Sequence, residues 1–286
     1  MVRMQQKHLP QKHLPQKLTD FFWCPVCKSS MHWAPPGSIV CANRHCFDIA
    51  KKGYVNFLNK PVRDSYDSVL FTSRRTVCQS GLFKPLTDKL SEIIAERFAK
   101  NVNILDAGCG EGSHLAAIGE RFGSDCVLAG FDIAKEAVKL ASGHHSGGIW
   151  CVADLANIPF GDGRFDAVTN ILSPGNYAEF KRVLKKDGLL LKVVPGSEYL
   201  QELRSLFYQG TEKETYSPQE VLTHFEKRFS PAETVPLRYQ ASPNAETLEH
   251  LVGMTPLSWH IPADQKNIAL PFVTMDFLII LGTLQS

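Results

Sequence analysis

The sequence predicts an α/β fold, in which a doubly wound, seven-stranded sheet of the Rossmann-like type follows a small N-terminal metal-binding module. Strand and helix patterns alternate from residue 101 onward, which is typical of a parallel sheet with helices on both faces. A glycine-rich turn, LDAGCGEG, closes the first of these strands at residues 105–112. Four of the eight cysteines fall within residues 24–46, a grouping that indicates a metal site.

Length and composition are those of a globular protein. The 286 residues are enough for one large and one small domain, and 44% hydrophobic with 21% charged residues is an ordinary balance. The chain has no run of 18 uncharged apolar residues, so we expect no membrane span. Its N-terminus lacks the apolar stretch of a secretory signal. The cysteines do not form a disulfide framework, which favours a reduced, cytoplasmic protein.

Four segments are expected along the chain. Residues 1–20 contain a tandem repeat of QKHLP with no apolar periodicity, so they are predicted to be a disordered tail. Residues 21–60 are rich in cysteine, aromatic and turn residues and are too few to fold alone, so they are predicted to be a zinc-binding module. Residues 61–100 are predicted to be a helical linker, and residues 101–286 the main domain.

The strands of the main domain are predicted from short apolar runs that end in turn residues. They lie at 102–107, 126–132, 149–154, 165–172, 188–195 and 272–281. Helices are expected to begin near Ser113 and Lys135, after the first and second strands. The last run is predicted to belong to an antiparallel pair that closes the sheet.

Two short ligand pairs indicate a zinc site. The spacing is Cys24-x2-Cys27-x13-Cys41-x3-His45. Zinc binds four such ligands in a tetrahedron, and four protein ligands leave no open position, so the site is predicted to be structural. Cys46 directly follows His45 and is an alternative fourth ligand. Unligated cysteines in a turn-rich segment are the remaining alternative.

The turn after the first strand indicates a site for S-adenosylmethionine (SAM). Asp106 is followed by Gly108, Gly110 and Gly112, which give G-x-G-x-G instead of the G-x-G-x-x-G of dinucleotide-binding proteins. Glycines permit a sharp turn and a close approach of the backbone to a ligand. SAM has no pyrophosphate, and the turn is suited to run along its methionine part. Glycines used only for packing, or an NAD-binding dehydrogenase, are the alternatives.

Two further carboxylates stand at strand ends where they would complete this site. Asp132 ends the second strand, 20 residues after Gly112, and is placed to accept both ribose hydroxyl protons. Asp154 ends the third strand and is placed to meet the adenine amino group, with Leu155 beside it. The sequence therefore predicts a SAM-dependent methyltransferase domain over residues 101–286.

Positive charge is concentrated in the first third of the chain. Residues 1–100 contain 16 Lys and Arg against 7 Asp and Glu, whereas residues 101–286 contain 15 against 22. This asymmetry indicates that the front part of the chain contacts a polyanion, for which RNA is the candidate, although a plain solvated surface is the alternative. The predicted phosphate contacts are Lys51, Lys52, Arg63, Arg74 and Arg75, with Tyr54, Tyr66 and Phe71 interleaved for stacking.

Several segments together resemble one enzyme family. They are CPVC, CANRHCFDIAKKGYVNFL, SRR followed by GLFKPL, ILDAGCGEG, FDIAKEAVK and MTPLSW. From about Phe22 to near its C-terminus, the chain resembles the RlmA-type 23S rRNA (guanine-N1)-methyltransferases, which include enzymes of tylosin and mycinamicin resistance, and more closely their Gram-positive branch. The resemblance implies SAM-dependent methylation of a guanine N1 in hairpin 35 of 23S rRNA, with macrolide resistance as a consequence. It also implies a homodimer that binds 23S rRNA.

The resemblance also implies roles for particular residues. The zinc ligands would be Cys24, Cys27, Cys41 and His45. The donor contacts would include Gly110, Glu111, Asp132 and Asp154. Phe83 and Tyr199 stand where members of the family can have a tyrosine and a histidine beside the donor, so a flat ring is kept while the hydrogen bonding changes.

The loop after the fourth strand is expected to hold the methyl acceptor, as it does in methyltransferases of this fold. It reads NILSPGNY at residues 170–177, and its candidate catalytic residues are Ser173, Pro174, Asn176 and Tyr177. Asn176 is placed to contact the guanine edge and Tyr177 to stack on the base. The alternative is a plain turn at Pro174 with Tyr177 in the core. No residue stands out as the general base that would remove the N1 proton.

Other functions stay open from the sequence alone. They are SAM-dependent methylation of another RNA, a protein or a small molecule, and RNA binding without catalysis. Binding through phosphates weakens steeply as salt rises, so the salt dependence separates the classes that bind RNA from methylation of a protein or a small molecule.

Overall fold

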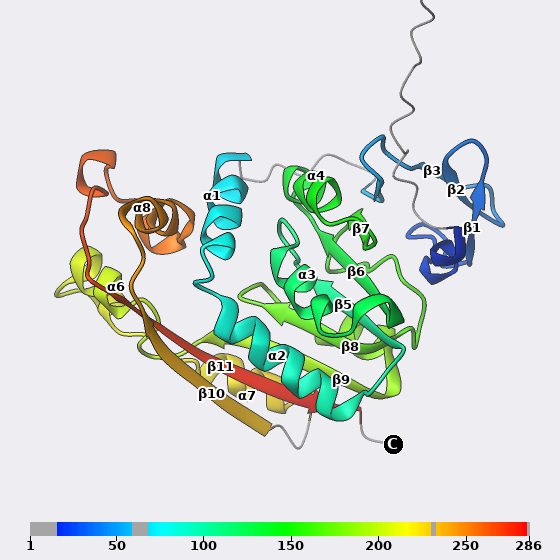
Figure 1. The fold of residues 1–286 in the computed structure, drawn as a ribbon. Helices are drawn as coiled ribbons and strands as arrows, with labels where there is room; N and C mark the ends of the chain where they lie inside the picture. The colour runs from blue at the N-terminus through cyan, green and yellow to red at the C-terminus, as the bar shows by residue number, and fades with distance from the viewer. Residues whose placement is uncertain (1–15, 59–67, 230–232, 285–286) are drawn as a thin grey trace, which may run out of the picture.

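The computed structural model describes residues 16–58, 68–229 and 233–284 as one large mixed sheet with helices on both faces and a small antiparallel sheet at one end (Figure 1). Residues 1–15 of the predicted tail lie outside the described part, and the 3-10 helix η1 (Gln16–Phe21) begins directly after them. None of the helices in the described ranges is long and apolar enough to cross a membrane.

The large sheet has eight strands. Their order across the sheet is β10 (Glu233–Ala241), β11 (Val273–Thr283), β9 (Leu184–Pro195), β8 (Phe165–Ile171), β5 (Val102–Ala107), β6 (Cys126–Asp132), β7 (Ile149–Val152) and β4 (Tyr54–Asn56). The strands from β9 to β4 are parallel, whereas β11 runs antiparallel to both β9 and β10. The predicted doubly wound sheet with a terminal antiparallel pair is confirmed.

The eighth strand corrects the predicted count of seven. β4 comes from the zinc module and pairs in parallel with β7, so that Val55 lies opposite Cys151. A three-residue strand has no periodicity that a sequence pattern can show, which is why the prediction did not include it. Because of this strand, the N-terminal module is continuous with the main sheet.

The helices lie on both faces of the sheet. They are α1 (Ser68–Gln79), α2 (Lys84–Arg97), α3 (Ser113–Glu120), α4 (Lys135–His144), α5 (Tyr177–Val183), α6 (Gln201–Tyr208), α7 (Gln219–Glu226) and α8 (Ala245–Met254). Short 3-10 helices lie at η2 (Gly123–Asp125), η3 (Glu212–Glu214), η4 (Pro256–Ser258) and η5 (Ala263–Gln265).

Successive side chains of each central strand enter opposite core layers. Ile104 of β5 joins the layer that contains Leu90 of α2, whereas Leu105 joins the layer that contains Phe180 of α5 and Phe225 of α7. This is the period of two expected for a strand covered on both faces. The segment 61–100, predicted as a helical linker, therefore contributes α2 to the main core.

The N-terminal module is docked against the loop that follows β7. Its strands β1 (Met31–Ala34), β2 (Ser38–Cys41) and β3 (Cys46–Asp48) form an antiparallel sheet in that order. The loop at 154–161 is bound to it by backbone hydrogen bonds, from Trp23 N to Pro159 O and from Gly161 N to Phe21 O, each 3.0 Å long. The Asn157 amide adds a third bond, to Pro25 O at 3.0 Å. The zinc module thus supports the loop that begins at Asp154.

Candidate active site and metal centre

Four predicted ligands converge in the N-terminal module. The ligand atoms of Cys24, Cys27, Cys41 and His45 all lie within 4.8 Å of one another. The Sγ atoms of Cys27 and Cys41 are 3.7 Å apart, and His45 Nδ1 lies 3.4 Å from Cys41 Sγ and 3.5 Å from Cys24 Sγ. A Zn–S bond of about 2.3 Å implies a tetrahedron edge of roughly 3.8 Å, so the spacing fits zinc. Cys46, the alternative ligand, is exposed and outside this cluster.

The environment of Cys27 favours the thiolate that binds a metal. Hydrogen bonds from Ser29, whose hydroxyl lies 3.2 Å from the sulfur, lower the pKa of Cys27 to about 5. Metal ligation requires deprotonated cysteine. The four side chains close the coordination shell, so a zinc ion here would stabilise the module and would supply no chemistry to substrate.

The glycine turn lies between β5 and α3 at the carboxyl edge of the sheet. Gly108 and Gly110 have φ angles of +80° and +55°, which lie in the left-handed region that favours glycine. A Cβ atom on Gly108 would overlap the Ser173 hydroxyl. The turn is therefore packed closely against the predicted acceptor loop, and glycine is required there by both conformation and space.

Asp132 holds the glycine turn in place. Its Oδ2 accepts a hydrogen bond from Gly110 N at 2.8 Å, and its Oδ1 accepts one from Ala134 N at 2.9 Å. Burial raises the pKa of this carboxyl although these amides favour its charge. Each carboxylate oxygen has a second lone pair, so Asp132 keeps the capacity to accept the two ribose hydroxyls.

Asp106 and Glu111 are buried acids beside the turn. Burial raises the pKa of Asp106 to about 7, and its Oδ1 accepts a hydrogen bond from Thr169 at 2.9 Å. Glu111 is only 1% exposed, and its Oε1 has no hydrogen-bond partner among the described residues, while Oε2 accepts one from Ser113. An unpaired buried carboxylate oxygen costs free energy, so the pocket fits a ligand that brings a cationic donor, as the SAM ammonium group does.

The other predicted donor contacts are Asp154, Leu155, Phe83 and Tyr199. Asp154 is exposed at the end of β7, where its Oδ1 accepts from Ala156 N at 2.8 Å, and Leu155 beside it is half-buried. Phe83 and Tyr199 are both buried, and their ring centroids lie 6.1 and 5.2 Å from that of Phe277. Their roles toward the donor stay predictions.

Lys192 is a buried cation that the sequence patterns did not single out. Its ammonium donates to Asn170 Oδ1 at 2.6 Å and to the Ser173 carbonyl. The Asn170 amide donates in turn to Ala107 O at 2.6 Å and Pro174 O at 3.0 Å. Lys192 and Asn170 thus tie the predicted acceptor loop to the end of β5. The sequence contains one indication of this buried cation, which is a lysine inside the apolar run GLLLKVVP.

Substitution of Lys192 by methionine is expected to slow methyl transfer at least tenfold, with a smaller effect on SAM affinity. The variant loses two hydrogen bonds from a charged donor, each worth about 1.5–3 kcal/mol, and both position the acceptor loop. Single-turnover assays and calorimetry measure the two effects. Lys185→Met is the matched control, because Lys185 is on the same strand but pairs with Asp166. Equal rates for the two variants would contradict the positioning role.

The stability of the Lys192 variant should also differ in its pH dependence. Burial lowers the pKa of Lys192 from 10.5 to about 8. Between these values the unfolded chain still binds the proton that the folded protein has released, so wild-type stability gains a contribution that rises with pH. The difference in unfolding free energy between wild type and Lys192→Met should therefore shift in favour of wild type from pH 8 to 10.5. A constant difference would contradict this.

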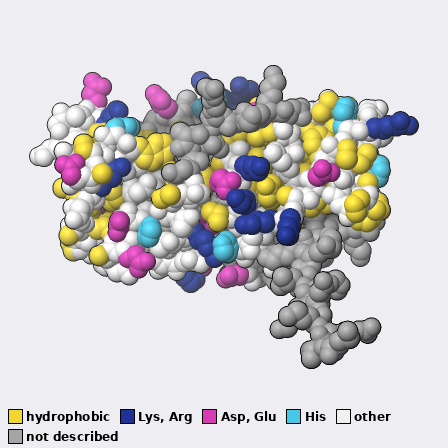
Figure 2. Space-filling model, turned by 90° about the horizontal axis from the view of Figure 1, so that it is seen from above, with side chains coloured by type: hydrophobic (Ala, Val, Ile, Leu, Met, Phe, Trp, Pro, Cys, Tyr) yellow, Lys and Arg dark blue, Asp and Glu magenta, His cyan; other side chains and the backbone are white. Residues whose placement is uncertain are grey.

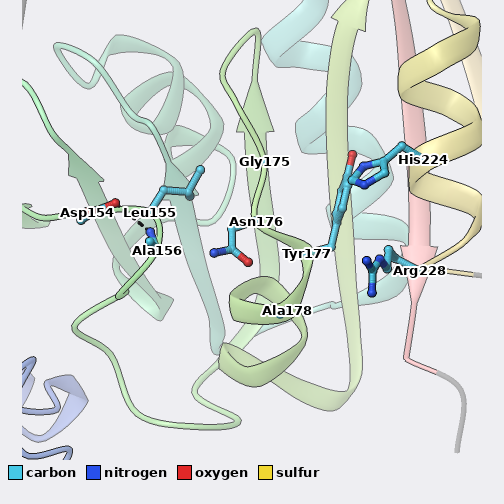
Figure 3. A pocket seen from close by; sticks show the side chains of 9 residues that line it. All are labelled: Asp154, Leu155, Ala156, Gly175, Asn176, Tyr177, Ala178, His224 and Arg228. Atoms are coloured by element: carbon cyan, nitrogen blue, oxygen red, sulfur yellow. Dashed lines mark hydrogen bonds between the residues drawn. The ribbon is translucent and has the colours of Figure 1, made fainter.

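A cavity of about 440 Å³ lies beside the acceptor loop (Figure 3). It is lined by Asp154, Leu155, Ala156, Gly175, Asn176, Tyr177, Ala178, His224 and Arg228. Figure 3 shows the Asn176 side chain between the loop of Asp154 and the side chains of His224 and Arg228, which come from α7 and the residues after it. The cavity thus joins the predicted adenine loop to the acceptor loop.

Two candidate acceptor residues also have structural roles. Asn176 caps α5 by accepting a hydrogen bond from Glu179 N at 3.3 Å. Tyr177 is 6% exposed, and its ring lies edge-on to Phe225 and Phe229 with centroids 5.5 and 6.2 Å away. This burial favours the core position for Tyr177 over stacking on a substrate base.

The residues predicted to contact RNA differ in their exposure and in their place in the structure. Lys51 and Lys52 are exposed, Arg75 is half-buried, and Arg63 lies outside the described residues. Arg74 points to the glycine turn, where its Nε is 3.9 Å from Glu111 Oε1. Of the aromatics predicted to stack, Tyr54 and Phe71 are buried, and Tyr66 lies outside the described residues.

Comparison with known proteins accounts for both parts of the chain. Residues 22–64 match the family model of the RlmA N-terminal zinc ribbon, and residues 104–188 match that of a methyltransferase domain. The two matches cover the metal cluster and the glycine turn with Asp132 and Asp154. The chain is therefore a methyltransferase with a zinc ribbon, and SAM and structural zinc are its cofactors.

Relatives match over nearly the whole chain. YxjB of Bacillus subtilis, provisionally named as a 23S rRNA (guanine-N1)-methyltransferase, is 41% identical over 278 residues, which cover 93% of this chain and 99% of the relative. The 23S rRNA (guanine(748)-N1)-methyltransferase of Streptomyces fradiae is 30% identical, covering 85% of this chain and 87% of the relative. A similarly named protein of Micromonospora griseorubida is 30% identical over 83% of this chain and 86% of its own length. The chain belongs to the RlmA-type family of 23S rRNA (guanine-N1)-methyltransferases.

Proposed function

We propose that this protein transfers the methyl group of SAM to N1 of a guanine in hairpin 35 of 23S rRNA. The observation that carries the proposal is that the zinc ribbon and the donor site form one unit, in which the ribbon is bonded to the loop of Asp154. A relative that covers both parts acts, by its name, on guanine 748, which makes that position our first candidate. We propose macrolide resistance as a consequence.

Some residues of the site bind the methyl donor, and others position the methyl acceptor. SAM supplies a methyl group on a sulfonium, activated for in-line displacement. Asp132 and the glycine turn bind and orient the donor, while Lys192 and Asn170 fix the acceptor loop. Guanine N1 carries a proton that must leave before or during attack, so fixing the base at the donor is a large part of the catalysis. The Asn176 amide lies in the cavity where it can contact a base edge.

The charge distribution supports an RNA substrate. Lys and Arg side chains gather near the middle of the face seen from above in Figure 2. Exposed Lys51 and Lys52 precede β4, the strand that joins the ribbon to the main sheet. Contacts from such side chains to phosphates release counterions, so binding should weaken steeply with salt.

The double substitution Lys51→Ala and Lys52→Ala is expected to weaken rRNA binding and to flatten its salt dependence. Two lost phosphate contacts should lower the slope of log K against log salt by roughly one to two units. Filter binding of a hairpin 35 transcript at several salt concentrations measures this slope. Lys84→Ala with Lys89→Ala removes the same charge from α2 and should leave the slope unchanged. Equal slopes for all three proteins would remove Lys51 and Lys52 from the interface.

Incorporation of a labelled methyl group tests the substrate class. The pure protein is incubated with methyl-labelled SAM and a bacterial lysate fraction that contains rRNA, ribosomal protein and small molecules. We expect label in large-subunit rRNA that is lost after nuclease treatment. Label in protein or small molecules, or no label despite SAM binding, would contradict the proposal.

We also propose that the protein is a cytoplasmic homodimer. Its substrate is made in the cytoplasm, and the family that it resembles includes dimers with a shared basic cleft. Light scattering of the purified protein tests the oligomeric state, and the mass of a single chain of 31.9 kDa would contradict the dimer.

A further inference from the structure

Arg74 stands at the donor site although the sequence predicted it on the RNA-binding surface. It lies in the middle of α1, and a Cβ atom placed on Gly110 would be 3.1 Å from its Nη1 and 3.2 Å from its Cζ. The guanidinium therefore covers the glycine turn within van der Waals reach. The position is fixed by the neighbouring residue Ser73, which is buried and whose Oγ lies 3.0 Å from His250 Nδ1 of α8.

Among the described residues, no carboxylate accepts a hydrogen bond from the guanidinium of Arg74. The ion pair with Glu111 is 3.9 Å long, which is beyond hydrogen-bond distance. Asp132 and Asp106 act on Arg74 through their charges, but their hydrogen bonds run to backbone amides and to the Thr169 hydroxyl. Cys78 lies one turn after Arg74, and burial raises the pKa of its thiol to about 12, so it stays neutral.

The pair of Arg74 and Glu111 has the charges that an α-amino acid group requires. Glu111 offers a buried carboxylate oxygen that has no hydrogen-bond partner among the described residues, which suits an ammonium group. Arg74 offers a planar fork of donors, which suits a carboxylate in bidentate geometry. Both groups lie beside the glycine turn at Gly110, where the methionine part of SAM is expected to lie.

We propose that Arg74 binds the carboxylate of the methionine part of SAM, and that α1 is thereby a wall of the donor site and not only an RNA contact. This inference rests on SAM as the donor, and it is independent of the RNA target. In this arrangement Arg74 is the cation that binds the carboxylate of SAM, and Glu111 is the anion that binds its ammonium group.

Decarboxylated SAM separates this role from a structural one, because it keeps the ammonium, the sulfonium and the nucleoside. Calorimetry without RNA compares SAM with decarboxylated SAM on wild type, Arg74→Met and Arg74→Lys. Wild type should prefer SAM by at least tenfold, since hydrogen bonds to a charged group are stronger than those between neutral groups. Arg74→Met should lose SAM affinity by a similar factor, bind decarboxylated SAM as wild type does, and no longer discriminate. Arg74→Lys should discriminate to an intermediate degree.

Arg75→Met is the matched control, because it removes the same charge from the next position of α1 and should keep the wild-type preference for SAM. An equal loss of affinity for both ligands in Arg74→Met, or unchanged SAM affinity, would overturn the inference while leaving the proposed function intact. Failure of wild type to bind SAM would overturn both this inference and the proposed function.

Discussion

Replacement of Cys27 by serine is expected to release zinc and to weaken SAM binding as well. Structural zinc contributes about 10–16 kcal/mol in small zinc domains, which exceeds the stability that this short module can have alone. The loop at 154–161 is bonded to Phe21, Trp23 and Pro25, so unfolding of the ribbon should loosen the donor loop. Metal analysis and calorimetry of the same preparation measure the two losses, and we expect SAM affinity to fall at least tenfold.

Cys46→Ser is the matched control, because Cys46 is exposed and outside the ligand cluster. It should retain zinc and wild-type SAM affinity. Asn157→Ala should retain zinc but lower SAM affinity slightly, since it removes one bond between the loop and Pro25. Zinc retained by Cys27→Ser would contradict the ligand assignment, and zinc lost without any change in SAM affinity would contradict the coupling.

Asp132→Ala is expected to reduce SAM affinity at least a hundredfold while the protein stays folded. The substitution removes the proposed ribose contacts and also frees Gly110 N and Ala134 N, so the donor loses both a partner and an ordered turn. Hydrogen bonds to a carboxylate are worth about 1.5–3 kcal/mol each, which supports this magnitude.

The isosteric variant Asp132→Asn should be intermediate, because its amide keeps one oxygen acceptor and replaces the other by a donor. Calorimetry gives the affinities, and circular dichroism monitors the fold. SAM binding by Asp132→Ala at wild-type affinity would show that Asp132 only supports the backbone and does not contact the ribose.

The parts of the site that the sequence predicted are those fixed by local spacing. Cys24, Cys27, Cys41 and His45 are paired by short turns, and the structure brings their ligand atoms together. The glycine turn follows directly from the end of β5, so its place at the carboxyl edge of the sheet was implied by the strand pattern. Local pattern is sufficient where the chain itself holds the residues together.

Other features depend on packing between distant segments. β4 becomes a strand only because it pairs with β7, about one hundred residues later. The ring of Tyr177 is covered by residues of α7 that no local pattern connects to the acceptor loop. Lys192 acquires its role from Asn170 and Ser173 on the neighbouring strand and loop. These roles arise from tertiary contacts and cannot be read from spacing alone.

Arg74 is a case in which helical spacing carried usable information. Phe71 and Val77 are buried and lie three residues before and after it, so all three share one face of α1. This phase places Arg74 toward the interior, whereas the charge count alone placed it with the RNA-binding residues. Reading charge together with helical phase would have separated Arg74 from Lys51 and Lys52.

Identification of the methylated base and atom tests the proposed reaction directly. Purified protein, SAM and unmodified 23S rRNA are incubated, and the rRNA is digested and analysed by mass spectrometry with mapping of hairpin 35. We expect 1-methylguanosine at a single guanine of that loop. Methylation at another atom or outside the loop, or none while SAM is bound, would contradict it.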